Sequence, residues 1–186
     1  MDNIEIKEIL SADIELYKTF LAAALQIDKE NLLITDQDNK ESTFPTKDRN
    51  DSFTLGAFVE NILAGIVSFT RDGGDREKLR HKGLISTMYV SKEFRGYGIA
   101  KRLLEEIIKK VKNVPDIEQI NLIVISDNLN AKKLYEKFGF SVRGVRPGYY
   151  NDTGDDALIM SLELDRNIRN DDPPAVALGE EHEERS

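Results

Sequence analysis

The chain has 186 residues, of which 40% are hydrophobic and 32% charged, and its formal net charge is −8 at pH 7. This length accommodates one domain with a proper core and is short for two domains of ordinary size. The composition is that of a soluble globular protein, and no apolar run is long enough to span a bilayer. The acidic balance disfavours nucleic acid as a partner, and the absence of cysteine excludes disulfides and an acyl-cysteine intermediate.

The two ends of the chain differ in character. The first residues, MDNIEIKEIL, lack the basic region and apolar run of a signal peptide, so we expect a cytoplasmic protein with no membrane partner. Residues 166–186 hold three arginines against six acidic residues, a Pro-Pro pair and few apolar side chains. We therefore expect one domain over residues 1–165, followed by an acidic, disordered tail over residues 166–186.

Apolar periodicity predicts a strand and a helix at the start of the domain. Residues 4–9 alternate apolar and charged side chains, as a half-buried strand does. Ser11 is then expected to cap a helix that continues to about residue 25 with apolar side chains at helical spacing. Residues 28–51 show no sustained period and contain Pro45, which predicts a loop with short helical pieces of a length that is often functional.

Three strands and a long helix are predicted next. Residues 53–59 and 62–70 flank Glu60-Asn61, a two-residue hairpin connection, and residues 83–90 follow a charged loop. A glycine-rich segment then leads into a helix that ends near Asn113, with lysines suited to the negative end of its dipole. The helix buries one face, made of Ile99, Leu103, Leu104, Ile107, Ile108 and Val111.

The last third of the domain repeats the alternation of strand and helix. Residues 120–125 form a nearly continuous apolar run, which indicates a strand covered on both faces. Residues 128–140 predict a capped helix with Gly139 at its C-terminal end. Two more strands, residues 141–150 and 156–164, complete a mixed sheet flanked by helices.

The turn after residues 83–90 has the chemistry of an anion site. Gly96 and Gly98 lack a Cβ, so a ligand can approach the backbone, and the N-terminus of the following helix presents unpaired N–H groups. Arg95, Lys101 and Arg102 add charge and hydrogen-bond donors that suit phosphate oxygens. We predict that a phosphate ester binds here, and an ordinary turn with a solvated basic rim is the alternative.

The spacing of residues in this turn narrows the choice of phosphate ester that would bind there. The dinucleotide fingerprint needs a third glycine where Lys101 stands, and the P-loop triplet G-K-[ST] occurs nowhere in the chain. The pattern R-x-x-G-x-A, from Arg95 to Ala100, instead resembles the pyrophosphate-binding motif of the GNAT (Gcn5-related N-acetyltransferase) superfamily. A second stretch, N-x-x-A-x-x-L-Y-x-x-x-G-F from Asn128 to Phe140, resembles another motif of these proteins at the expected distance. The chain is therefore identified as a single-domain member of this superfamily.

The resemblance implies an α+β fold, an α/β/α sandwich with a mixed, mostly antiparallel sheet, and acetyl-CoA as co-substrate. The segment from Arg95 to Lys101 would cradle the pyrophosphate, and the backbone of Met88 and Val90 would pair with the pantetheine arm as an added strand does. Asn128 would bind the pantetheine or cap its helix. The implied cofactor-binding residues are Met88, Val90, Arg95, Gly96, Gly98, Ala100, Lys101 and Asn128.

The implied reaction is direct attack of a primary amine on the thioester without an acyl-enzyme. Tyr135 would protonate the leaving thiolate, and core packing is the alternative role for this side chain. A module that binds or senses acyl-CoA without turnover is the alternative function. No metal is expected, because His81 is the one histidine before the acidic tail and no cysteine accompanies it.

The acceptor and the general base stay open. The acceptor is a small-molecule amine or an amine of a peptide or protein, and a homodimer is neither indicated nor excluded. The pair Tyr149-Tyr150 followed by DDALIM is similar to the end of ribosomal-protein and N-terminal acetyltransferases. Those relatives commonly carry an acid or histidine where Ile123 stands here, and this departure argues against a peptide N-terminus as the acceptor.

Several polar residues remain as alternatives for base or acceptor binding. A water molecule relayed through Thr87 or Tyr149 is one route for the amine proton, and Asp152 or Asp155 is another. Acids in the expected acceptor loops, such as Asp36 and Asp38, would attract a cationic amine, although a solvated loop predicts the same residues.

Overall fold

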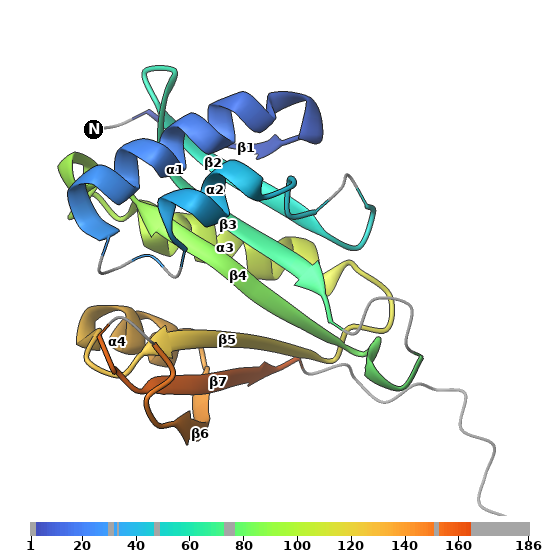
Figure 1. The fold of residues 1–186 in the computed structure, drawn as a ribbon. Coiled ribbons are helices and arrows are strands. Elements are labelled where there is room, and N and C mark those ends of the chain that lie inside the picture. Colours follow the sequence, from blue (N-terminus) through green and yellow to red (C-terminus); the bar gives the residue numbers. More distant parts are fainter. Residues whose placement is uncertain are drawn as a thin grey trace, which may run out of the picture.

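A computed structural model describes residues 3–29, 32, 34–46, 49–72, 77–150 and 153–164. Within these residues one seven-stranded sheet forms the centre of the molecule, with the strand order β1-β2-β3-β4-β5-β7-β6 (Figure 1). The strands are β1 (Ile4–Ile9), β2 (Phe53–Val59), β3 (Ile62–Arg71), β4 (Lys82–Val90), β5 (Gln119–Ile125), β6 (Ser141–Arg146) and β7 (Ala157–Glu163). All neighbouring strands pair antiparallel except β4 and β5, which pair parallel. The predicted mixed sheet is confirmed.

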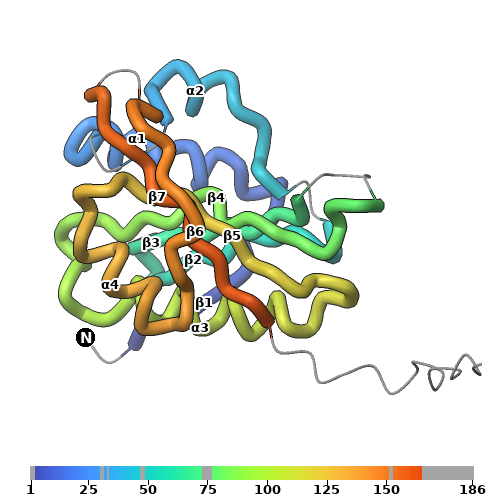
Figure 2. Tube along the Cα trace, turned by 90° about the horizontal axis from the view of Figure 1, so that it is seen from below, coloured from blue at the N-terminus to red at the C-terminus, as the bar shows by residue number. Residues whose placement is uncertain are grey.

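Helices cover both faces of the sheet. The α-helices are α1 (Ile14–Asp28), α2 (Asp36–Glu41), α3 (Ile99–Lys112) and α4 (Leu129–Lys137). Figure 2 shows α1 and α2 on one side of the sheet and α3 and α4 on the other. The apolar stripe predicted for α3 is buried against the sheet, and Leu103, Leu104 and Ile107 have no exposed surface. Aromatic side chains of α1, Tyr17 and Phe20, fill the core on the opposite face.

The parallel pair β4 and β5 separates partway along its length. The two strands pair through four positions, from Lys82 opposite Gln119 to Ile85 opposite Leu122. Ser86 is then an extra residue in β4, because Ile85 faces Phe69 of β3 and Thr87 faces Ser68. Such a bulge bends a strand and increases its twist. Beyond it the two strands diverge (Figure 1), and each keeps one backbone edge that its parallel neighbour does not pair.

Turn chemistry explains several element boundaries. Glu60 and Asn61 have φ of 50° and 67°, as a two-residue hairpin connection requires, so that prediction is confirmed. The predicted cap at Ser11 is wrong, because Ser11 begins a short 3₁₀ turn (Ser11–Asp13) and α1 starts at Ile14. The strand predicted over residues 141–150 ends at Arg146, since Pro147 has no N–H to donate and Gly148 has φ of 57°.

Two features of the sequence fall outside the described residues, namely the domain limit expected at residue 165 and the acidic tail over residues 166–186. Among the residues that the structure does describe, no helix combines the length and the apolar character needed to cross a membrane.

Candidate functional site

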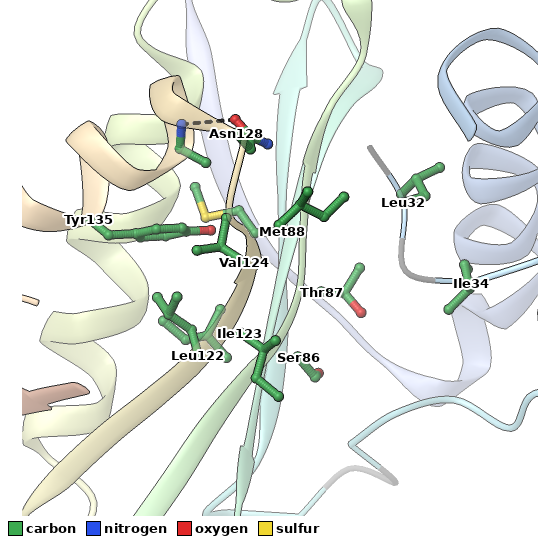
Figure 3. A pocket seen from close by; sticks show the side chains of 13 residues that line it. Leu32, Ile34, Ser86, Thr87, Met88, Leu122, Ile123, Val124, Asn128 and Tyr135 are labelled. Carbon is green, nitrogen blue, oxygen red and sulfur yellow. Dashed lines mark hydrogen bonds between the residues drawn. The ribbon is translucent and has the colours of Figure 1, made fainter. Parts of the chain in front are cut away.

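A cavity of about 90 Å³ opens where β4 and β5 diverge (Figure 3). Its walls come from four segments: β4, β5, α4 and the connection between α1 and α2. The lining residues are Leu32, Ile34, Ile85, Ser86, Thr87, Met88, Leu122, Ile123, Val124, Ile125, Asn128, Ala131 and Tyr135. In Figure 3 Tyr135 and Asn128 lie on one side of β4, and Leu32 and Ile34 lie on the other. The sequence predicted the first pair and missed the second, because residues 28–51 carry no recognisable pattern.

A larger groove of about 380 Å³ leads from this cavity to the glycine-rich loop. The groove and the cavity share Met88, Asn128, Ala131 and Tyr135, so the two spaces are adjoining parts of one path. At its far end the groove is lined by Val90, Arg95 and Ala100 among others. The structure therefore brings together most of the side chains that the two sequence motifs predicted.

The glycine-rich loop presents backbone donors at the far end of this path. Gly96 and Gly98 have φ of 85° and 77°, which an L side chain rarely adopts. Gly98 is the N-cap of α3 and offers no side chain to the free N–H groups that follow it, and the first turn contains no acidic residue. Space around the Cα of both glycines is open. These donors, together with the helix dipole, fit a pyrophosphate.

The Arg95 side chain, which was predicted to bind the pyrophosphate, has partners within the protein. Its guanidinium forms an ion pair with Asp28, and its Nε donates a hydrogen bond to the Val90 carbonyl at 3.0 Å. A direct contact between this side chain and a pyrophosphate therefore stays a prediction. Lys101 is exposed, with Glu105 as its partner at 3.5 Å on the same helix. Asp28 was not predicted as a site residue, although it follows Ala24 and Leu25 at helical spacing on the buried face of α1.

Tyr135 reaches the cavity from the buried face of α4. Its ring is 8% exposed and packs edge-on against Phe140, with the ring centroids 5.8 Å apart. The hydroxyl points into the cavity toward Val124 and Met88 (Figure 3). Burial raises the pKa of Tyr135 to about 12, so the phenol is protonated throughout the physiological range. The side chain thus has a core-packing role and also places a proton donor in the cavity.

Asn128 caps α4 and also lines both spaces. Its side-chain Oδ1 accepts a hydrogen bond from the Ala131 N–H at 3.1 Å, which confirms the predicted capping role (Figure 3). The predicted contact with pantetheine stays a prediction, for which the position of Asn128 beside the groove is suitable.

The residues proposed as a base are placed unfavourably or lie outside the described part of the chain. The Thr87 hydroxyl lines the cavity but is hydrogen-bonded to the phenol of Tyr17. Tyr149 is 43% exposed and packs under Arg146. Asp155 lines a hollow beside the N-terminus of α4 that adjoins the cavity through Ile125 and Asn128, but it does not line the cavity itself. Asp152 is not among the described residues. Among those that are, no carboxylate or imidazole lines the cavity.

The other polar residues singled out in the sequence have local roles. Asp38 accepts hydrogen bonds from the backbone and hydroxyl of Thr35 at the start of α2, and these bonds lower the pKa of its carboxyl. The backbone carbonyl of His81 accepts hydrogen bonds from the N–H groups of Glu118 and Gln119. Within the described residues, no three metal-ligating side chains lie close enough together to hold an ion.

The model of the Acetyltransferase (GNAT) family matches residues 16–140. The chain belongs to this family. An N-alpha-acetyltransferase from Saccharolobus solfataricus is 36% identical over 113 residues, which are 58% of this chain and 67% of that protein. A crystal structure of an acetyltransferase of the GNAT family from Streptococcus pneumoniae aligns with a TM-score of 0.72 and 26% identity, over 87% of this chain and 99% of that chain.

A further structural neighbour carries the co-substrate. The structure of yncA from Salmonella typhimurium, with its cofactor acetyl-CoA, aligns with a TM-score of 0.71 and 19% identity over 94% of this chain and 100% of that chain. This likeness shows the shared fold. GNAT proteins use acetyl-CoA, and the chain is an acetyl-CoA-dependent N-acetyltransferase, as its two motifs predicted.

The capping role of Asn128 and its predicted contact with pantetheine can be separated by substitution. We expect Asn128→Ala to lower the free energy of unfolding by about 1 kcal/mol, because the cap of α4 is lost, and Asn128→Asp to retain it. Both variants are expected to bind acetyl-CoA more weakly, since neither keeps the amide N–H donors. Urea unfolding and calorimetric titration measure the two effects. Full affinity in the Asp variant would leave capping as the sole role of this residue.

Proposed function

We propose that this GNAT protein acetylates the α-amine of a protein or peptide N-terminus by direct attack on acetyl-CoA. The observation that carries the proposal is the cavity between the diverging strands. It places the Tyr135 hydroxyl at one end, adjoins a groove leading to the glycine-rich loop, and has no carboxylate or imidazole among its described lining residues. The glycine-rich loop would bind the pyrophosphate, and the edge of β4 that β5 leaves unpaired, at Met88 and the N–H of Val90, would pair with the pantetheine arm.

The chain supplies two groups to the transfer step. The amine nitrogen forms a bond to the acetyl carbon as the C–S bond of the thioester breaks. A backbone N–H of the β4 edge near Met88 to Val90 would stabilise the oxyanion, a contribution typically worth about 10²–10³ in rate. Tyr135 would give its hydroxyl proton to the leaving sulfur and regain one from solvent, while the amine proton leaves to solvent.

The high pKa of Tyr135 bears on this role. A phenol with a pKa of about 12 is a weak acid beside a thiol of ordinary pKa, about 8.5. However, the apolar surroundings that raise the pKa of Tyr135 also raise the pKa of a thiol placed next to it. The pKa difference between Tyr135 and a thiol in the same cavity is therefore smaller than the difference between Tyr135 and a thiol in water, which makes the proton transfer less unfavourable.

The lack of a base in the described lining favours an α-amine. At pH 7 about a tenth of an α-amine is unprotonated, compared with about one part in a few thousand of a lysine side chain. Ile123, whose departure from the acid or histidine of N-terminal acetyltransferases argued against this acceptor in the sequence, lines the cavity and supplies no base there. The α-amine is nevertheless the acceptor that needs a base least. Leu32 and Ile34 give the end opposite Tyr135 an apolar wall, which suits a neutral side chain better than a polyamine. The similarity to an N-alpha-acetyltransferase supports the same acceptor class.

Thiol release from acetyl-CoA measures this acceptor preference. We expect turnover with a peptide whose N-terminus is free, and little with the same peptide blocked at its N-terminus and carrying a lysine. The rate should rise to about pH 8, as the α-amine loses its proton, and then level off without a fall below about pH 10 because Tyr135 stays protonated. Preference for the lysine peptide would contradict the proposed acceptor. Tight binding of acetyl-CoA without thiol release for any amine up to about pH 9 would instead indicate an acyl-CoA sensor.

The role of Tyr135 is tested by removing its hydroxyl alone. We expect Tyr135→Phe to lower kcat by about 10²-fold and to leave acetyl-CoA affinity almost unchanged, because the ring still packs against Phe140. Stopped-assay turnover and calorimetry give the two values, and Tyr149→Phe, which removes an exposed hydroxyl, is the matched control. An unchanged rate in Tyr135→Phe would remove this residue from the mechanism.

A further inference from the structure

Asp28 is a buried carboxylate that the transfer reaction does not use. It is the last residue of α1 and is 5% exposed. Its side chain forms an ion pair with Arg95 and accepts a hydrogen bond from the Tyr89 hydroxyl. We call these three residues, Asp28, Tyr89 and Arg95, the Asp28 cluster. A charged group buried to this extent is retained only where its partners compensate the loss of water.

Asp28, Tyr89 and the Val90 carbonyl hold the guanidinium of Arg95 on three sides. One terminal nitrogen binds Asp28, Nε donates to the Val90 carbonyl at 3.0 Å, and the Tyr89 ring lies 5.5 Å from the guanidinium carbon. Val90 is the last residue of β4, and Gly96 and Gly98 of the phosphate-binding loop follow Arg95 directly along the chain. The ion pair therefore fixes the loop relative to both α1 and the end of β4.

The segment that follows Asp28 contributes to the opposite wall of the cavity. Leu32 and Ile34 follow Asp28 by four and six residues, and both line the cavity. The position of α1's last turn sets where this wall begins. One partly buried ion pair thus connects the segment that would present backbone donors to the phosphates with the segment that would face the acceptor.

We infer that Asp28 is a positioning residue that joins the phosphate-binding loop to the acceptor wall, and that Arg95 acts through Asp28 instead of binding the pyrophosphate with its guanidinium. The part that concerns the acceptor rests on the proposed function, whereas the part that concerns acetyl-CoA does not. Rotating Arg95 toward a ligand would remove the ion-pair partner of the buried Asp28 carboxylate and break the contact with Val90, so the closed cluster is the favoured arrangement.

A double-mutant cycle on acetyl-CoA binding tests the inference without any acceptor. The variants are Asp28→Asn, Arg95→Gln and the double substitution, with calorimetry measuring Kd. We expect each single substitution to weaken binding by about tenfold, and the double variant to be no weaker than the weaker single one, because both remove the same contact. Glu106→Gln, which removes the carboxylate of an exposed ion pair on α3, is the matched control and should bind normally.

Direct binding by the guanidinium predicts a different pattern. In that case Asp28→Asn would bind acetyl-CoA as well as the wild type or more tightly, because Arg95 is released, and Arg95→Gln alone would weaken binding. Either that pattern or additive losses in the double variant would overturn the inference. Since both outcomes are measured on binding alone, they are independent of whether an N-terminal amine is the acceptor.

A milder variant covers the case in which Asp28→Asn does not fold. Tyr89→Phe removes one hydrogen bond to Asp28 and keeps the ring that packs edge-on against Phe20. We expect it to raise the Kd for acetyl-CoA and, with a substrate peptide, the KM for the acceptor, while kcat at saturation changes little. An unaltered Kd and KM in a folded Tyr89→Phe variant would contradict the positioning role.

Discussion

The separation of β4 from β5 is the constraint on which the rest of the site depends. Two parallel strands that stayed paired to their ends would leave no backbone edge for a ligand and no space between them. Here the pairing stops after Ile85 and Leu122, with a bulge at Ser86, and each strand keeps its other neighbour, β3 or β7. The opening is therefore supported on both sides by the sheet, which makes it a rigid feature of the fold.

The remaining parts of the site are placed relative to this opening by the elements that follow each strand. β4 leads into the glycine-rich loop and α3, whose N-terminus would supply donors for phosphates. β5 leads into α4, which is capped by Asn128 and carries Tyr135 into the cavity. In the proposed function each strand thus continues into one half of the acetyl-CoA site, whereas the acceptor side would be formed by α1, the described residues Leu32 and Ile34 that follow it, and the Asp28 cluster.

Local patterns in the sequence were sufficient to predict most of the helices and strands and the family. The apolar stripe of α3, the hairpin at Glu60-Asn61 and the two motifs depend on neighbours within a few residues, so the sequence displays them directly. The sequence does not display the opening between β4 and β5, because this opening accompanies a bulge in β4 that is defined by its pairing with β3. Asp28 was missed for a related reason: its partner Arg95 lies 67 residues away. The one sign in the sequence was that an acidic residue, Asp28, stands at a position on the apolar face of a helix.

Hydrogen exchange of the β4 amides tests most directly whether the edge of β4 that β5 leaves unpaired receives the pantetheine arm. Peptide-resolved exchange is measured with and without saturating acetyl-CoA. We expect slower exchange over residues 86–90 when acetyl-CoA is bound, and no change over residues 83–85, which β3 and β5 already pair on both sides. Equal exchange over residues 86–90 in both conditions, with binding verified by calorimetry, would contradict this pairing.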